Sequence, residues 1–146
     1  NSDFTVYDKI YLDPKLTETV PRDQYFYTAM DAYIHCMESL SGIYRNPVGD
    51  AFSNQCIELC REIFLGEQDM MSDENRAKLM VASYLGGVAI AASYVGIVHP
   101  LSAGLSVVFG THHCVGNCIV MRAMSDHYSA YFDEYTCSTT ELLHRP

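Results

Sequence analysis

Four side chains in two separate stretches of the sequence have the types and the spacing of a metal site. Asp31 and His35 stand four residues apart, so on a helix they would share one face with about 6 Å between their Cβ atoms. His99 and His113 follow in a second, largely apolar stretch, 93–121, and are fourteen residues apart. One carboxylate and three imidazoles suit Zn²⁺ or Fe²⁺ better than Ca²⁺ or Mg²⁺.

Simpler explanations exist for each of these residues taken alone. Asp31 and His35 could form an exposed pair or a hydrogen bond within one helix. His99 precedes a proline at a junction between two predicted helices, where an imidazole can bind a free backbone group. His112 and His113 open the last predicted helix, whose dipole disfavours a cation and keeps imidazole in the neutral form that a metal needs. The four would meet only if the helix predicted at 100–109 reverses the chain.

The cysteines do not form a recognisable metal-binding motif. Two pairs lie at helical i, i+4 spacing rather than the CxxC spacing of a structural zinc site, and we expect them in the core. Cys36 and Cys114 neighbour candidate ligands, and either could join the metal site. The sequence contains no GxGxxG, Walker or GxSxG motif, so it predicts no cofactor-binding phosphate loop. Because no signal peptide opens the sequence, we expect reduced thiols and a cytoplasmic location.

Composition limits the classes of partner. The chain has 146 residues, which predicts one domain, and 49% of them are hydrophobic. The formal net charge of −9 argues against nucleic acids and anionic membrane surfaces as partners, because both attract cationic faces. No apolar run reaches the ~20 residues that span a bilayer. Only 18% of residues are charged, which indicates apolar surface covered by another copy or another domain.

Periodicity predicts a mainly α-helical fold with one N-terminal strand. The strand is expected at 4–13, from its β-branched and aromatic residues, and a connector follows to residue 20. Apolar residues then recur at helical spacing over 22–44, 49–65, 75–95, 100–109 and 111–132. We therefore divide the chain into a strand and connector at 1–20, a helical domain at 21–135 and a loose tail at 136–146.

These segments resemble the iron-containing (group III) alcohol dehydrogenase family. The resemblance is carried by MDAYIH at 30–35, by the fourteen-residue spacing of His99 and His113, and by the runs IYLDPKLTETVP and ASYLGGVAIAASYVGIVHPLSAGL. The segment HPLSAGLSVVFGTHHC is similar to the 3-deoxy-manno-octulosonate 8-oxidase branch. Residues 2–135 take part in the resemblance, which implies a helical bundle like that family's metal-binding domain.

The resemblance implies a reaction as well as a metal site. It assigns Asp31, His35, His99 and His113 to one divalent metal, Fe²⁺ or Zn²⁺, which polarises an alcohol oxygen while NAD(P) accepts hydride. Many members carry a further histidine where this chain has Ala103, so we predict His112 as a substitute in proton transfer. The family's nucleotide-binding half and the end of its helical half are absent from this sequence, which we interpret as a truncated gene product.

Two main hypotheses of function follow. The first is a truncated metal-binding domain that is not an autonomous enzyme, since hydride transfer needs a positioned cofactor. A small alcohol or sugar acid would be its substrate only if the missing half is supplied. The second is a metal-free interaction module that forms a homo-oligomer, a dimer or higher, through its exposed strand and weakly charged surface. A small metallohydrolase is a third alternative, for which the sequence offers no positioned general base.

Overall fold

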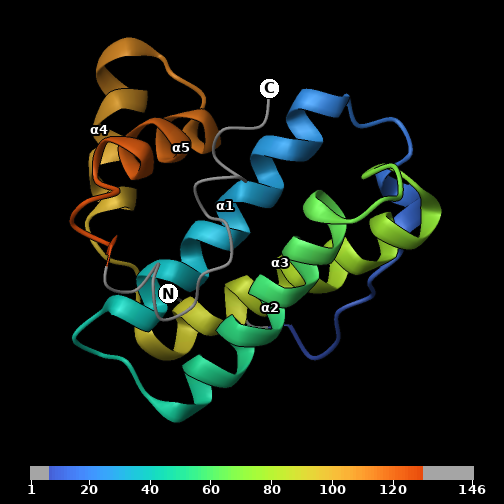
Figure 1. Ribbon diagram of the computed structural model, residues 1–146, viewed down its shortest axis with the longest axis horizontal. Helices are drawn as coiled ribbons and strands as arrows, with labels where there is room; N and C mark the ends of the chain where they lie inside the picture. Colours follow the sequence, from blue (N-terminus) through green and yellow to red (C-terminus); the bar gives the residue numbers. More distant parts are fainter. Residues whose placement is uncertain (1–6, 130–146) are drawn as a thin grey trace.

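The computed structural model describes residues 7–129, which fold into five α-helices (Figure 1). A short 3-10 helix, η2 (Pro14–Thr17), precedes α1 (Arg22–Ser41), α2 (Pro47–Leu65), α3 (Asp73–Ser93), α4 (Val98–Phe109) and α5 (His113–Ala123). The mainly helical fold expected from the periodicity is confirmed. The predicted tail at 136–146 lies outside the described residues.

The central helix is α1, which packs against α2 and α3 on one side and against α5 on the other (Figure 1). From Ala29 to Leu40 its residues are buried almost all the way round, including Tyr33, Ile34 and Leu40 at 0% exposure, as is typical of a helix enclosed by others. Gly86 of α3 makes a close approach to this helix possible, because a Cβ there would lie 3.0 Å from the Ala32 carbonyl oxygen. The helix that carries Asp31 and His35 is thus held from several directions.

Local signals explain most of the helix boundaries. Asn46 caps α2, its side-chain oxygen accepting from the backbone N–H groups of Val48 and Gly49, and Pro47 fills the first helical position. Ser72 caps α3 by accepting from the Asn75 N–H. Gly110, with φ +68°, ends α4, a left-handed conformation that glycine adopts without steric cost.

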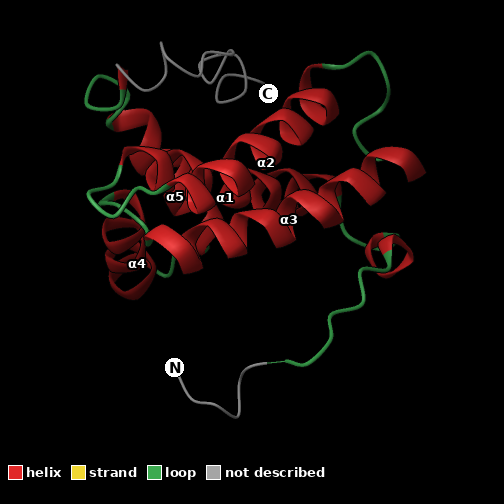
Figure 2. Ribbon diagram, turned by 90° about the horizontal axis from the view of Figure 1, so that it is seen from below, coloured by secondary structure: helices red, strands yellow, loops and turns green. Residues whose placement is uncertain are grey.

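Two expectations of secondary structure were wrong. Residues 7–13 form no strand; they run away from the helices as an exposed segment (Figure 2), because no second strand exists within 7–129 to pair with them. Residues 4–6 of that predicted strand lie outside the described part. The last helix, expected at 111–132, ends at Ala123, after which the chain turns and buries Tyr128.

No single helix within residues 7–129 is both long and apolar enough to cross a bilayer; α3 and α4 pass that test only together, as a pair bent by 110°. All five cysteines in this part of the chain are free thiols.

Candidate metal centre

Helix α1 supplies the first two side chains of the centre. Asp31 and His35 lie one turn apart on the face of α1 that looks toward α4, and their side chains are 20% and 18% exposed. The His35 Nε2 atom lies 4.0 Å from Asp31 Oδ2. The i, i+4 spacing therefore places both groups on one face, as expected from the sequence.

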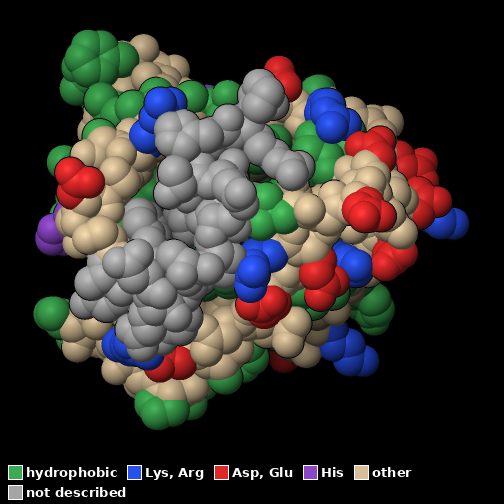
Figure 3. All heavy atoms as spheres, viewed as in Figure 1, with side chains coloured by type: hydrophobic (Ala, Val, Ile, Leu, Met, Phe, Trp, Pro, Cys, Tyr) green, Lys and Arg blue, Asp and Glu red, His purple; other side chains and the backbone are tan. Residues whose placement is uncertain are grey.

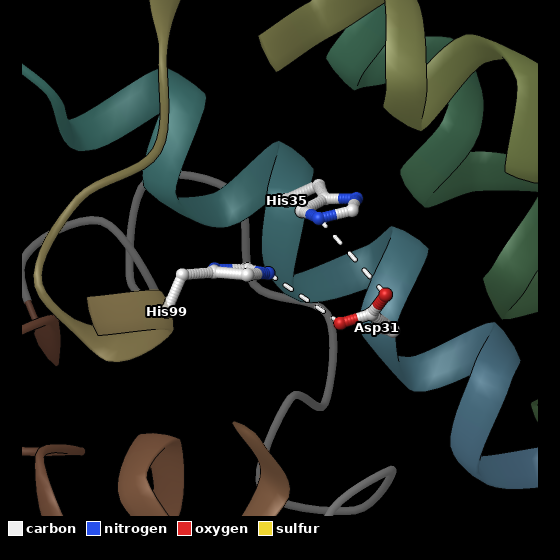
Figure 4. Close-up of side chains that lie close together, drawn as sticks. All are labelled: Asp31, His35 and His99. Carbon is white, nitrogen blue, oxygen red and sulfur yellow. Dashed lines mark ion pairs between the residues drawn. The ribbon is translucent and has the colours of Figure 1, made fainter. Parts of the chain in front are cut away.

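Helix α4 brings His99 to the same place, as Figure 4 shows. The chain bends by 110° between α3 and α4, and His99 sits in the first turn of α4, 8% exposed. Its ring stacks on that of His35 with centroids 4.4 Å apart and planes 19° from parallel. Its Nε2 atom faces Asp31 Oδ1 at 3.4 Å.

Helix α5 begins with the fourth side chain. His113 Nε2 lies 3.7 Å from Asp31 Oδ1, and its ring centroid is 5.6 Å from that of His99. The Ser102 hydroxyl of α4 donates to the His113 carbonyl at 2.9 Å and joins the two helices. His113 is the most exposed of the four, at 43%, so the cluster opens to the surface on the α5 side.

The spacing of these atoms fits a metal ion. Two ligand atoms that each lie ~2.1 Å from a tetrahedral metal are about 3.4 Å from one another. The ligand atoms of Asp31, His35 and His99 all lie within 4.8 Å of each other. His113 is not part of that group, but its Nε2 atom lies 3.7 Å from Asp31 Oδ1. The buried Nε2 of His99 has no hydrogen-bond partner among the described residues. An unpartnered imidazole nitrogen aimed at a carboxylate is a ligand position for a cation.

Burial and neighbouring charges shift the pKa values of the cluster in different directions. Burial raises the pKa of Asp31, but the neighbouring His99 ring and the charge of His35 outweigh it and hold this pKa below its usual value. For His35, burial is the largest cause and lowers the pKa. Burial also lowers the pKa of His99, yet the carboxylates of Asp31 and Glu38 overcome it and raise the pKa to about 9. Without a metal, a protonated His99 therefore balances the negative charge of the cluster.

Comparison with known proteins identifies the fold that carries this cluster. Residues 25–140 match the family described as Fe-containing alcohol dehydrogenase, C-terminal. The chain belongs to the Fe-containing alcohol dehydrogenase family. That match covers four of the five described helices in full and most of the fifth, so the resemblance noted in the sequence is confirmed.

Individual relatives are considerably longer than this chain. It is 31% identical to alcohol dehydrogenase 4 of Schizosaccharomyces pombe over 110 residues, 75% of this chain and 26% of the relative. It is also 31% identical to the NAD-dependent methanol dehydrogenase of Bacillus methanolicus over 111 residues, 75% of this chain and 29% of the relative. A crystal structure of 1,3-propanediol oxidoreductase superposes with a TM-score of 0.74 at 27% identity, covering 92% of this chain and 35% of that one. The chain thus spans about a quarter to a third of these family members.

Other candidate residues lie at the edge of the cluster or outside it. His112 is exposed, and its Nε2 atom lies 3.4 Å from the Gln24 side-chain nitrogen; its predicted role in proton transfer stays a prediction. Ala103 is exposed on α4. Burial raises the pKa of the Cys114 thiol to about 11, and the nearby Asp31 charge adds to that effect.

Sequence reasoning missed two polar partners of the centre. Glu38, fully buried on α1, pairs with His99 Nδ1. Asn117, fully buried on α5, donates to Asp31 Oδ1, and its side-chain nitrogen lies 3.1 Å from His113 Nε2. Both stand at helical spacing from a candidate ligand, Glu38 three residues after His35 and Asn117 four after His113. The signal available in the sequence was a polar residue on the same face of an otherwise apolar helix as a candidate ligand.

Proposed function

We propose that this chain is a helical metal-binding domain of the Fe-containing alcohol dehydrogenase type and that it binds one divalent transition metal, Fe²⁺ or Zn²⁺. The proposed ligands are Asp31, His35, His99 and His113. The observation that supports the proposal most is the convergence of three imidazoles, carried by three different helices, on one carboxylate within 3.4 to 4.0 Å.

The side chains of the centre would hold and orient the ion. The Asp31 carboxylate supplies negative charge, and the stacked rings of His35 and His99 brace one another against rotation. When bound, a divalent metal supplies Lewis-acid polarisation of an alcohol oxygen. An alcohol would approach from the open side of the cluster at His113, the most exposed of the four side chains.

We infer that hydride transfer to NAD(P) from a small alcohol or sugar acid requires protein beyond this chain. The matched part of this chain covers only 26% and 29% of two relatives that carry dehydrogenase names. The sequence also lacks a glycine-rich phosphate loop. The purified chain is therefore expected to bind metal without NAD(P)-dependent turnover.

Metal analysis of protein purified without a histidine tag tests the metal centre. We expect one equivalent of iron or zinc per chain in the parent protein and its loss in Asp31→Asn and His99→Ala. Asp23→Asn removes an exposed acid from the same helix and should retain the full equivalent. Sub-stoichiometric metal that is indifferent to Asp31 and His99 would contradict the proposal.

A second candidate function, a self-associating interaction module, is supported by the surface of α4. No Asp, Glu, Lys or Arg occurs between Lys78 and Arg122. Within that stretch Val107, Val108 and Phe109 are 86%, 71% and 74% exposed. Figure 3 shows hydrophobic side chains at the end of α4, upper left, with most of the charged groups at the other end of the molecule. Exposed apolar patches of this kind are typical of protein interfaces.

A further inference from the structure

We propose that Glu38 is a positioning residue of the metal centre, holding the His99 imidazole so that its Nε2 atom faces the metal ion. The inference rests on the proposed metal-binding function and adds a residue that would not touch the metal itself. Metal-binding histidines generally donate their second ring N–H to a carboxylate or carbonyl, which fixes the tautomer and orientation of the ring.

Glu38 is a carboxylate at a fully buried position, which is unusual for an acidic residue. Its side chain has 0% exposure, and it stands on α1 among the apolar side chains of the core. A buried carboxylate costs several kcal/mol unless partners compensate it. Among the described residues it forms no ion pair with Lys or Arg, and its charged partner is His99. Packing alone therefore does not explain an acid at this position, whereas a role at His99 does.

Both oxygens of the Glu38 side chain are engaged, and an ionised carboxylate acts as the acceptor in each contact. Oε1 accepts from the Val98 backbone N–H at 2.6 Å and from the Tyr128 hydroxyl at 3.3 Å. Oε2 pairs with His99 Nδ1. The first contact satisfies a free N–H at the start of α4, and the second makes Nδ1 the donor nitrogen of the His99 ring. Nε2, on the opposite side of that ring, is then left to face Asp31 at 3.4 Å.

The loop between α3 and α4 leaves room for this carboxylate. A Cβ atom at Gly96 would lie 2.7 Å from Glu38 Oε1 and 3.1 Å from the Tyr128 hydroxyl. Gly96 has no positive φ, so replacing it acts by steric contact rather than by backbone strain. The position gives a second way to displace Glu38 without changing its chemistry.

Glu38→Gln is the sharpest variant, because glutamine keeps the shape and offers one acceptor where two are needed. The amide oxygen must face the Val98 N–H, so the amide NH₂ falls against His99 Nδ1. Nδ1 must then accept, and the proton moves to Nε2, where it blocks the metal. Gly96→Ala should displace the carboxylate sterically. Gly104→Ala on α4, where an added Cβ meets nothing within 4 Å, is the matched control.

The experiment is a Co²⁺ titration of the full chain, followed by the ligand-field absorption spectrum and checked for folding by circular dichroism. We expect Glu38→Gln and Gly96→Ala to bind Co²⁺ roughly 10- to 100-fold more weakly than the parent, with an altered spectrum, and Gly104→Ala to match the parent. A purely structural role for Glu38 would lower thermal stability and leave the spectrum of the folded, Co²⁺-loaded variant unchanged.

The outcomes separate this inference from the metal centre itself. Parent-like affinity and spectrum in folded Glu38→Gln overturn the positioning role alone, whereas a parent chain that binds no Co²⁺ overturns both. Should both variants fail to fold, nitrogen-15 NMR of the Zn²⁺-loaded parent decides the point. A proton on His99 Nδ1 supports the positioning role, and a proton on Nε2 contradicts it.

Discussion

At the scale of single residues, the Asp31 carboxylate is the point where the three parts of the centre meet. It faces His35 of its own helix, His99 of α4 and His113 of α5, and it accepts a hydrogen bond from Asn117. In the metal-free chain the amide of Asn117 and the protonated His99 supply the positive charge density that this carboxylate needs. Binding of a metal ion would therefore displace the proton on His99 and change the orientation of the Asn117 amide.

Asn117→Asp tests this balance of charge. A second carboxylate beside Asp31 should destabilise the metal-free chain by roughly 1–3 kcal/mol, because neither charge gains a new partner. A divalent ion would neutralise both, so the gap in Tm between Zn²⁺-loaded and EDTA-treated protein should widen relative to the parent. Thermal unfolding followed by circular dichroism measures both values.

Asn117→Leu provides the control, since it removes the amide contact without adding charge. It should lower the Tm of both forms by similar amounts. An Asn117→Asp protein that is as stable as the parent in EDTA would show that this side chain does not lie beside the Asp31 carboxylate.

At the scale of elements, the sequence predicts helix boundaries that a local capping residue sets. It does not predict a boundary that depends on a contact with a distant residue. Asn46, Ser72 and Gly110 are local signals, and the helices begin or end beside them. No comparable signal marks Ala123, where α5 ends. The chain leaves the helix there and Tyr128 is buried, its hydroxyl 3.3 Å from Glu38, a contact that helical periodicity cannot reveal.

The junction between α3 and α4 is a second feature that could not be predicted from the sequence. The helix expected to run to residue 95 ends at Ser93, and the C-cap residue Tyr94 has φ +62° and ψ 175°. That conformation is close to glycine-only and costs a bulky residue about 1–3 kcal/mol. The strained residue leads directly into the turn that presents His99.

We expect Tyr94→Gly to be more stable than Tyr94→Ala by about 1–2 kcal/mol, because both lose the ring contact with Tyr44 and only glycine relieves the strain. Urea unfolding of the two variants measures the difference. Equal stabilities, or a more stable alanine variant, would show that residue 94 does not hold a positive φ in solution.

At the scale of the whole molecule, the candidate ligands could be predicted from the sequence, whereas the residues that surround them could not. The residue types and the two spacings of Asp31, His35, His99 and His113 indicated a cluster, and the structure brings these four side chains together. The contribution of Glu38 depends on how α4 crosses α1, which no spacing within one helix encodes. The predicted strand failed for the opposite reason, since residues 7–13 have local strand preference and no partner strand in the described chain.

The absence of charged residues between Lys78 and Arg122 predicts self-association through α4. Val107→Glu combined with Phe109→Glu should shift the parent from dimers or larger oligomers toward monomers in sedimentation velocity, because both side chains are largely exposed on α4 and charge opposes apolar contact. Ile43→Glu, at a site that is 92% exposed between α1 and α2, is the matched control and should leave the distribution unchanged. A monomeric parent would contradict self-association.

The central claim is that one carboxylate and three imidazoles bind one ion, and X-ray absorption at the metal edge of the Zn²⁺-loaded chain tests it most directly. The account predicts nitrogen and oxygen ligands at about 2.0–2.2 Å, with outer-shell scattering from three imidazole rings that falls to two rings in His113→Ala. A shell of oxygen atoms without imidazole scattering, or a spectrum that His113→Ala leaves unchanged, would contradict it.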